Sequence, residues 1–159
     1  MTVASNLSQY EIERNKPMPN RIHGQIQGDL VFLLNLQYRE KYNISSEVSL
    51  ATKPSSTPDI CIFPKKKLSL KTVKAKEEEA PITTIEIQSP SQSIEELQHK
   101  AWNLYFPMGV KSAWIIIPSL KAVKILLADD QEFFFNSGKL KDPVTNIEIE
   151  IKEIFANMV

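Results

Sequence analysis

The stretch Ile82-Thr-Thr-Ile-Glu-Ile-Gln88 decides the fold of this chain. Its β-branched residues predict a strand, in which alternation places Glu86 and Gln88 on one face and Ile85 and Ile87 on the other. A carboxylate buried in so apolar a strand is costly without a partner. Glu86 is therefore expected to be paired or to coordinate a cation.

A second carboxylate, Asp59, lies at the start of another short apolar strand, predicted at residues 58–63. If the two strands are neighbours, Asp59 and Glu86 converge on one divalent ion. Mg²⁺ suits such a site because it prefers a few carboxylate oxygens and keeps several waters, and Mn²⁺ is the other candidate. The carbonyl of Ile87 is a plausible further ligand.

Hydrolysis of a phosphodiester usually employs a lysine as well, which orients water and offsets negative charge on the phosphate. The expected strand position holds Gln88, which carries no charge. Lys100 is the substitute: it lies on the flank of a helix predicted from Ser93 to Pro107, and a long lysine there can extend to the sheet edge. Each residue also has an ordinary structural explanation: Asp59 could cap a turn, Glu86 could pair with a lysine, and Lys100 could lie on the surface.

Outside these segments the pattern is that of a mixed α/β fold, a central sheet with helices packed against it. Asn20 is expected to cap a helix that runs to Tyr38. Strand character recurs at residues 44–51, 113–117, 123–128 and 133–135, the last as an edge strand. Residues 1–19 are expected to form a loose arm with a short strand at residues 10–12, and residues 20–159 a single domain. The lysine-rich connection at residues 64–80 is expected to be a solvated loop, with contact to a polyanion as the alternative.

Composition narrows the class of protein further. The chain has 19 basic and 19 acidic residues, so any contact with nucleic acid must depend on local charge. A single cysteine, Cys61, excludes an internal disulfide and favours a reducing compartment. No apolar run approaches the ~20 residues of a membrane span, and the N-terminus lacks a signal-peptide pattern, so a cytoplasmic location is expected. With only 4 glycines, a dinucleotide fingerprint is excluded.

Several motifs together resemble the Uma-two family of endonucleases. They are His23-Gly24, the run around Glu47, Pro58-Asp59-Ile-Cys-Ile, Ile85-Glu-Ile-Gln-Ser-Pro-Ser91, and Lys100…Tyr105…Gly109 followed by Trp114-Ile-Ile-Ile-Pro118. The resemblance implies the PD-(D/E)xK nuclease superfamily, with a restriction-endonuclease-like mixed sheet flanked by helices. It also implies metal binding by Asp59 and Glu86 and a displaced catalytic lysine at Lys100. His23 and Glu47 match motif positions and are candidates for lining the cleft.

Three hypotheses follow. The first is a Mg²⁺-dependent endonuclease acting on DNA, for which a homodimer is expected because cutting both strands of a duplex requires two sites. The second is an inactive protein that keeps the nuclease fold to bind nucleic acid or protein. The third is a structural dimer module that uses the edge at residues 133–135.

Overall fold

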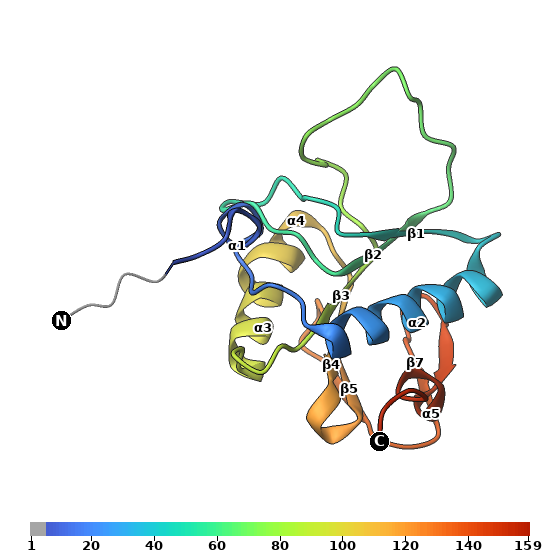
Figure 1. The fold of residues 1–159 in the computed structure, drawn as a ribbon. Helices are drawn as coiled ribbons and strands as arrows, with labels where there is room; N and C mark the ends of the chain where they lie inside the picture. The colour runs from blue at the N-terminus through green and yellow to red at the C-terminus, as the bar shows by residue number, and fades with distance from the viewer. Residues whose placement is uncertain (1–5) are drawn as a thin grey trace.

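The structure, a computed structural model, describes residues 6–159 and contains a six-stranded sheet in the order β1-β2-β3-β4-β5-β6 (Figure 1). The strands are β1 (Tyr42–Ser46), β2 (Ile60–Pro64), β3 (Thr83–Ile87), β4 (Ser112–Ile117), β5 (Ala122–Leu127) and β6 (Glu132–Phe135). β3 and β4 run parallel, and the other neighbouring pairs are antiparallel. The predicted mixed sheet flanked by helices is confirmed, and β6 is an edge strand.

Helix α2 (Arg21–Tyr38) covers one face of the sheet, together with the hairpin β7 (Lys139–Lys141) and β8 (Glu148–Glu150) and the short helix α5 (Ile151–Ile154). The Asn20 side chain caps α2 by accepting from the His23 backbone N–H, as its sequence predicts. Ile26, Leu30 and Leu34 of α2 are fully buried against β-strand residues that include Ile85 and Ile87.

The opposite face is covered by the connection between β3 and β4. It consists of α3 (Ile94–Lys100), a π-helix η1 (Ala101–Tyr105) and α4 (Phe106–Met108), which ends at Gly109. Leu97, Ala101 and Tyr105 pack there with Cys61 and Ile115. Because neighbouring residues of a strand point to opposite faces, Glu86 points toward this layer while Ile85 and Ile87 point toward α2.

Three predictions about local structure were wrong. The strand expected at residues 10–12 is instead part of α1 (Gln9–Arg14), whose N-terminus is closed by a capping box between Ser8 and Glu11. The strand expected at residues 44–51 spans Tyr42–Ser46 only, because Glu47 has a φ of 52° and leaves the extended conformation. The helix expected from Ser93 to Pro107 is not a continuous α-helix, since η1 interrupts it.

The remaining segments connect these layers. Residues 65–82 form the long β2–β3 connection, which projects from the sheet in Figure 1, and a short 3₁₀ turn η2 (Pro118–Leu120) joins β4 to β5. Within residues 6–159, no helix is both long enough and apolar enough to cross a membrane. The division of the chain into an arm at residues 1–19 and a domain at residues 20–159 stays a prediction.

Candidate active site

Asp59 and Glu86 lie side by side at one end of the sheet. The antiparallel register pairs Ile60 with Ile85, and its continuation by one residue places Asp59 opposite Glu86. The Asp59 backbone N–H donates to Glu86 Oε1 at 3.2 Å, and the Ile87 backbone N–H donates to Asp59 Oδ2 at 2.7 Å. Both side chains are buried. The sheet therefore joins the two carboxylates that the sequence singled out.

Lys100 reaches Glu86 from the helical layer. Its Nζ lies 3.0 Å from Glu86 Oε2, and the hydroxyl of the fully buried Tyr105 donates to the same oxygen at 3.3 Å. Five residues of an α-helix span ~1.4 turns and would set Lys100 and Tyr105 roughly 140° apart. In η1 the Phe106 N–H donates to the Ala101 carbonyl, five residues back, and this wider turn brings Lys100 and Tyr105 to one side.

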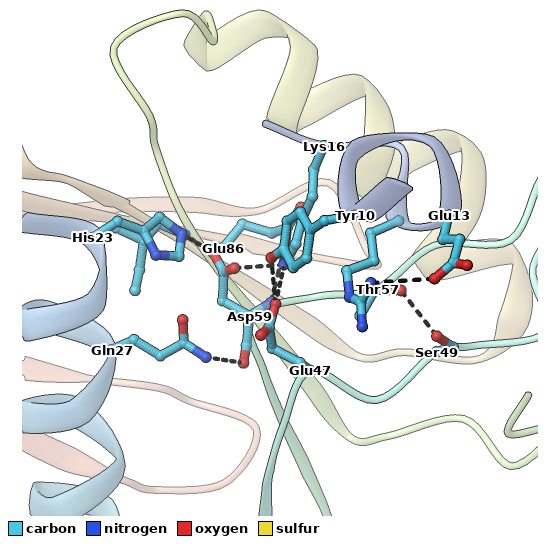
Figure 2. Close-up of polar contacts among 12 residues, drawn as sticks. Tyr10, Glu13, Lys16, His23, Gln27, Glu47, Ser49, Thr57, Asp59 and Glu86 are labelled. Atoms are coloured by element: carbon cyan, nitrogen blue, oxygen red, sulfur yellow. Dashed lines mark hydrogen bonds and ion pairs between the residues drawn. The ribbon is translucent and has the colours of Figure 1, made fainter. Parts of the chain in front are cut away.

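His23 and Gln27, one turn apart on α2, approach Asp59 from the other side of the sheet. His23 Nε2 lies 3.1 Å from Asp59 Oδ2, and the Gln27 amide donates to the Asp59 carbonyl at 3.0 Å. Figure 2 shows both side chains directed from α2 toward Asp59. The second ring nitrogen, His23 Nδ1, is buried without a hydrogen-bond partner among the described residues. His23 is therefore buried and belongs to the carboxylate cluster.

Lys16, just after α1, provides a second ammonium group at the site. Its Nζ lies 2.6 Å from Asp59 Oδ1 and 3.2 Å from Glu47 Oε1, and its side chain is only 5% exposed. Figure 2 shows Lys16 meeting Asp59 opposite His23. Tyr10 of α1 donates to the same Glu47 oxygen at 2.5 Å. The N-terminal segment therefore closes one side of the carboxylate pair.

These contacts shift the pKa values of Asp59, Lys16 and Tyr10. Burial favours the neutral form of Asp59, but the His23 hydrogen bond and the charge of Lys16 outweigh it, so the pKa of Asp59 is lowered. Burial favours the neutral form of Lys16 as well, which would lower its pKa, but attraction to Asp59 and Glu86 outweighs burial and raises the pKa of Lys16. Burial and then the hydrogen bond to Glu47 raise the pKa of Tyr10 to about 12.

The ligand atoms available at the site are of the type that a hard divalent cation prefers, because Asp59, Glu86 and Glu47 offer carboxylate oxygens. These three carboxylates outnumber the two lysines of the site. However, among residues 6–159 no group of three His, Cys, Asp or Glu side chains lies in an arrangement that could hold a metal ion. In addition, Lys16 contacts Asp59 Oδ1 and Lys100 contacts Glu86 Oε2. Asp59 and Glu86 are the residues that would hold Mg²⁺, once an ion had displaced an ammonium group.

One predicted site residue, Gln88, does not join this cluster, and Cys61 is a buried core residue. The Gln88 amide donates to the Gln92 carbonyl at 2.9 Å, so its side chain is engaged in the turn after β3 and makes no hydrogen bond to the two carboxylates. Cys61 is buried in the core beneath α3, where burial, followed by the nearby Glu86 charge, raises the pKa of its thiol. For Ile87, the observed contact of the site is its backbone N–H rather than its carbonyl.

Sequence reasoning missed Lys16, Tyr10 and Tyr105 as site residues. Lys16 lies in a polar stretch between Asn15 and Pro17, and nothing in that stretch distinguishes it from a surface lysine. The Ser8–Glu11 capping box was the available signal that a helix precedes it. Tyr105 follows Lys100 by five residues, a spacing that an α-helical pattern does not place on one face.

Comparison with solved structures defines the class of protein. A crystal structure described as "a putative nuclease belonging to DUF820", from Anabaena variabilis, matches with a TM-score of 0.74 and 22% sequence identity, over 91% of this chain and 86% of that chain. The fold is therefore nuclease-like. A sequence model of the family Uma2, described as "Putative restriction endonuclease", matches residues 3–147, so the chain belongs to that family. Among curated proteins no match is found.

Proposed function

We propose that this protein is a Mg²⁺-dependent endonuclease that hydrolyses phosphodiester bonds of DNA, with Mn²⁺ as an alternative ion. The observation that carries the proposal is the meeting of Asp59, Glu86 and Lys100 at one end of strands β2 and β3. Membership of a family described as restriction endonucleases supports the same activity.

In this proposal the residues divide the work by their contacts. Asp59 and Glu86 would hold the ion, which when bound would supply positive charge to stabilise the phosphate and to lower the pKa of an attacking water. Lys100 offsets the negative charge that develops on the phosphate, and His23 and Tyr105 keep Asp59 and Glu86 in place. The oxygen of water forms the new P–O bond and the opposite P–O ester bond breaks, while the attacking water loses a proton to solvent and the leaving oxygen takes one from solvent.

Calorimetric titration with Mg²⁺ or Mn²⁺ tests the site directly. The native protein is expected to bind, and Asp59→Asn and Glu86→Gln, which keep the size of each side chain, are expected not to bind. Glu40→Gln is the matched control, because Glu40 is an exposed carboxylate beyond the end of α2. Failure of the native protein to bind at millimolar metal, with and without added DNA, would refute the proposal.

Cleavage of supercoiled plasmid DNA then tests Lys100. Lys100→Met is expected to abolish cleavage while it retains metal binding, because it removes the charge but keeps most of the side-chain length. Circular dichroism of each variant establishes that the fold is intact. Cleavage at the native rate by Lys100→Met would remove this lysine from the proposed mechanism.

One observation favours a second candidate function, an inactive nuclease fold that binds nucleic acid or protein. Each oxygen of Asp59 and Glu86 already has a donor within the chain, so the cluster is also a complete structural ion-pair network. Salt-dependent DNA binding that neither requires metal nor leads to cleavage would favour this candidate.

The expected homodimer and cytoplasmic location remain proposals. β6 is a free sheet edge and Phe134 is 54% exposed there, which supports an edge-to-edge dimer. Light scattering of the native protein and of Phe134→Lys tests it: the native protein is expected to be a dimer, and the variant a monomer.

A further inference from the structure

A groove of about 1080 Å³ opens beside the candidate site. It is bounded by the start of α2, by residues 88–90 after β3, by residues 118–121 between β4 and β5, and by residues 157–159. His23 belongs to both places, since it lines the groove and contacts Asp59. A ligand in the groove would therefore be separated from Asp59 by one side chain, that of His23.

The lining of the groove suits a negatively charged ligand. Its charged side chains are Arg21 and Lys121, both exposed, and no Asp or Glu side chain lines it. Neither cation forms an ion pair with another side chain of residues 6–159. The hydroxyl groups of Ser89 and Ser119 add further donors. Arginine, lysine and serine are side chains that contact phosphate oxygens in nucleic-acid complexes.

The same lining argues against recognition by base stacking. No Phe, Tyr or Trp lines the groove, and its apolar members are aliphatic or proline side chains such as Leu120 and Pro90. Stacking on aromatic rings is how proteins usually hold unpaired bases. Contacts to the sugar–phosphate backbone are the ones that this surface offers.

The lysine-rich connection at residues 64–80, for which the sequence analysis gave contact with a polyanion as the alternative, lies in a less suitable place. It follows the end of β2, whereas Asp59 precedes the start of that strand, so a five-residue strand of roughly 15 Å separates them. Two of its lysines are paired within the same connection, Lys66 with Glu79 and Lys74 with Glu78. Figure 1 shows the loop projecting away from the start of α2.

We propose that the groove binds one phosphodiester strand of the substrate, with Arg21 and Lys121 each neutralising a phosphate. The inference rests on the proposed nuclease function and adds to it the surface that holds the strand. It assigns nucleic-acid binding to the groove rather than to the lysine-rich loop.

Fluorescence anisotropy of a labelled oligonucleotide tests the inference, with Ca²⁺ as a hard cation that takes oxygen ligands as Mg²⁺ does. The double variant Arg21→Ala/Lys121→Ala is expected to bind roughly 10- to 100-fold more weakly. For this variant, the slope of log K against the logarithm of the salt concentration is expected to be shallower by about 2, which is about one unit for each lost phosphate contact. Lys67→Ala/Lys71→Ala removes the same charge from the loop and is the matched control, which is expected to bind as the native protein does. DNA and RNA oligonucleotides of one sequence, tested in parallel, distinguish the two sources of the strand.

The outcomes separate this inference from the proposed function. Native-like binding by the groove variant, or a loss confined to the loop variant, would overturn the groove assignment, and so would a native protein that binds no oligonucleotide. Calorimetry of Mg²⁺ on Asp59→Asn and Glu86→Gln reports on the proposed function independently, because it requires no nucleic acid. Both positions of the groove variant are exposed, so circular dichroism is expected to show an unchanged fold.

Discussion

Replacing Lys16 by methionine is the perturbation that most directly tests the arrangement of the site. Lys16 Nζ lies 2.6 Å from Asp59 Oδ1 in a nearly solvent-free environment. Methionine keeps much of the side-chain length but removes the charge, so Asp59 Oδ1 loses its partner. Asp59 Oδ2 keeps its contacts with His23 and the Ile87 N–H.

The magnitude follows from the cost of leaving one member of a buried ion pair alone, about 3–5 kcal/mol. Because Asp59 retains its other contacts, we expect the lower end, about 3 kcal/mol of unfolding free energy. For a chain of this length that corresponds to a fall in Tm of roughly 6–12 °C. The control Lys152→Met, at an exposed position of α5, is expected to change Tm little.

Urea unfolding of both variants, in EDTA and in saturating Mg²⁺, gives the assay. An ion at 100 times its Kd stabilises the folded state by about 2.7 kcal/mol. An ion bound at the proposed site would compete with Lys16 for Asp59 Oδ1, so Mg²⁺ is expected to stabilise Lys16→Met more than it stabilises the native protein. Equal stability of variant and native protein in EDTA would refute the buried contact. An equal effect of Mg²⁺ on both would refute the competition between Lys16 and the ion.

Three further predictions concern other contacts. Because the pKa of Asp59 is lowered in the folded protein, its ionised form stabilises the fold above about pH 4, the unfolded pKa, and this stabilisation is lost as the pH falls through the lower folded pKa. Urea unfolding in EDTA at acidic pH should show this loss of stability, and Asp59→Asn should abolish the pH dependence. Asp142→Ala should lower the unfolding free energy by about 3 kcal/mol in urea unfolding, because the fully buried Asp142 accepts hydrogen bonds from Ser112 at 2.6 Å and from Trp114 at 2.8 Å. A loss no larger than that of a surface substitution would contradict this prediction. Tyr105→Phe should lower the unfolding free energy by about 1 kcal/mol, measured by urea unfolding, and should slow plasmid cleavage, because Glu86 loses one hydrogen-bond donor. Unchanged cleavage would show that Tyr105 does not position Glu86.

The alternation of β3 was sufficient to place Glu86 on one face of the sheet and its isoleucine neighbours on the other. Asn20 likewise identified the start of α2, because a capping side chain acts on backbone groups only a few residues away. The pairing of Asp59 with Glu86 required one assumption, that β2 and β3 are neighbours, and the observed register confirms it. These features depend on interactions within a segment or between adjacent strands, and such interactions leave a period or a motif in the chain.

The remaining parts of the site depend on packing between distant segments. Lys16 lies 43 positions before Asp59 in the chain, and only the docking of the N-terminal segment brings its ammonium group to that carboxylate. Tyr105 reaches Glu86 because η1 widens the helix, which the 3.6-residue pattern does not reveal. Gln88 is the first residue after β3, and its amide donates to the Gln92 carbonyl in the turn that follows. The sequence by itself determined which strand positions carry the two carboxylates, because strand alternation is local. Only the tertiary structure decided which cations and hydroxyl groups surround them, because those contacts form when separate elements pack together.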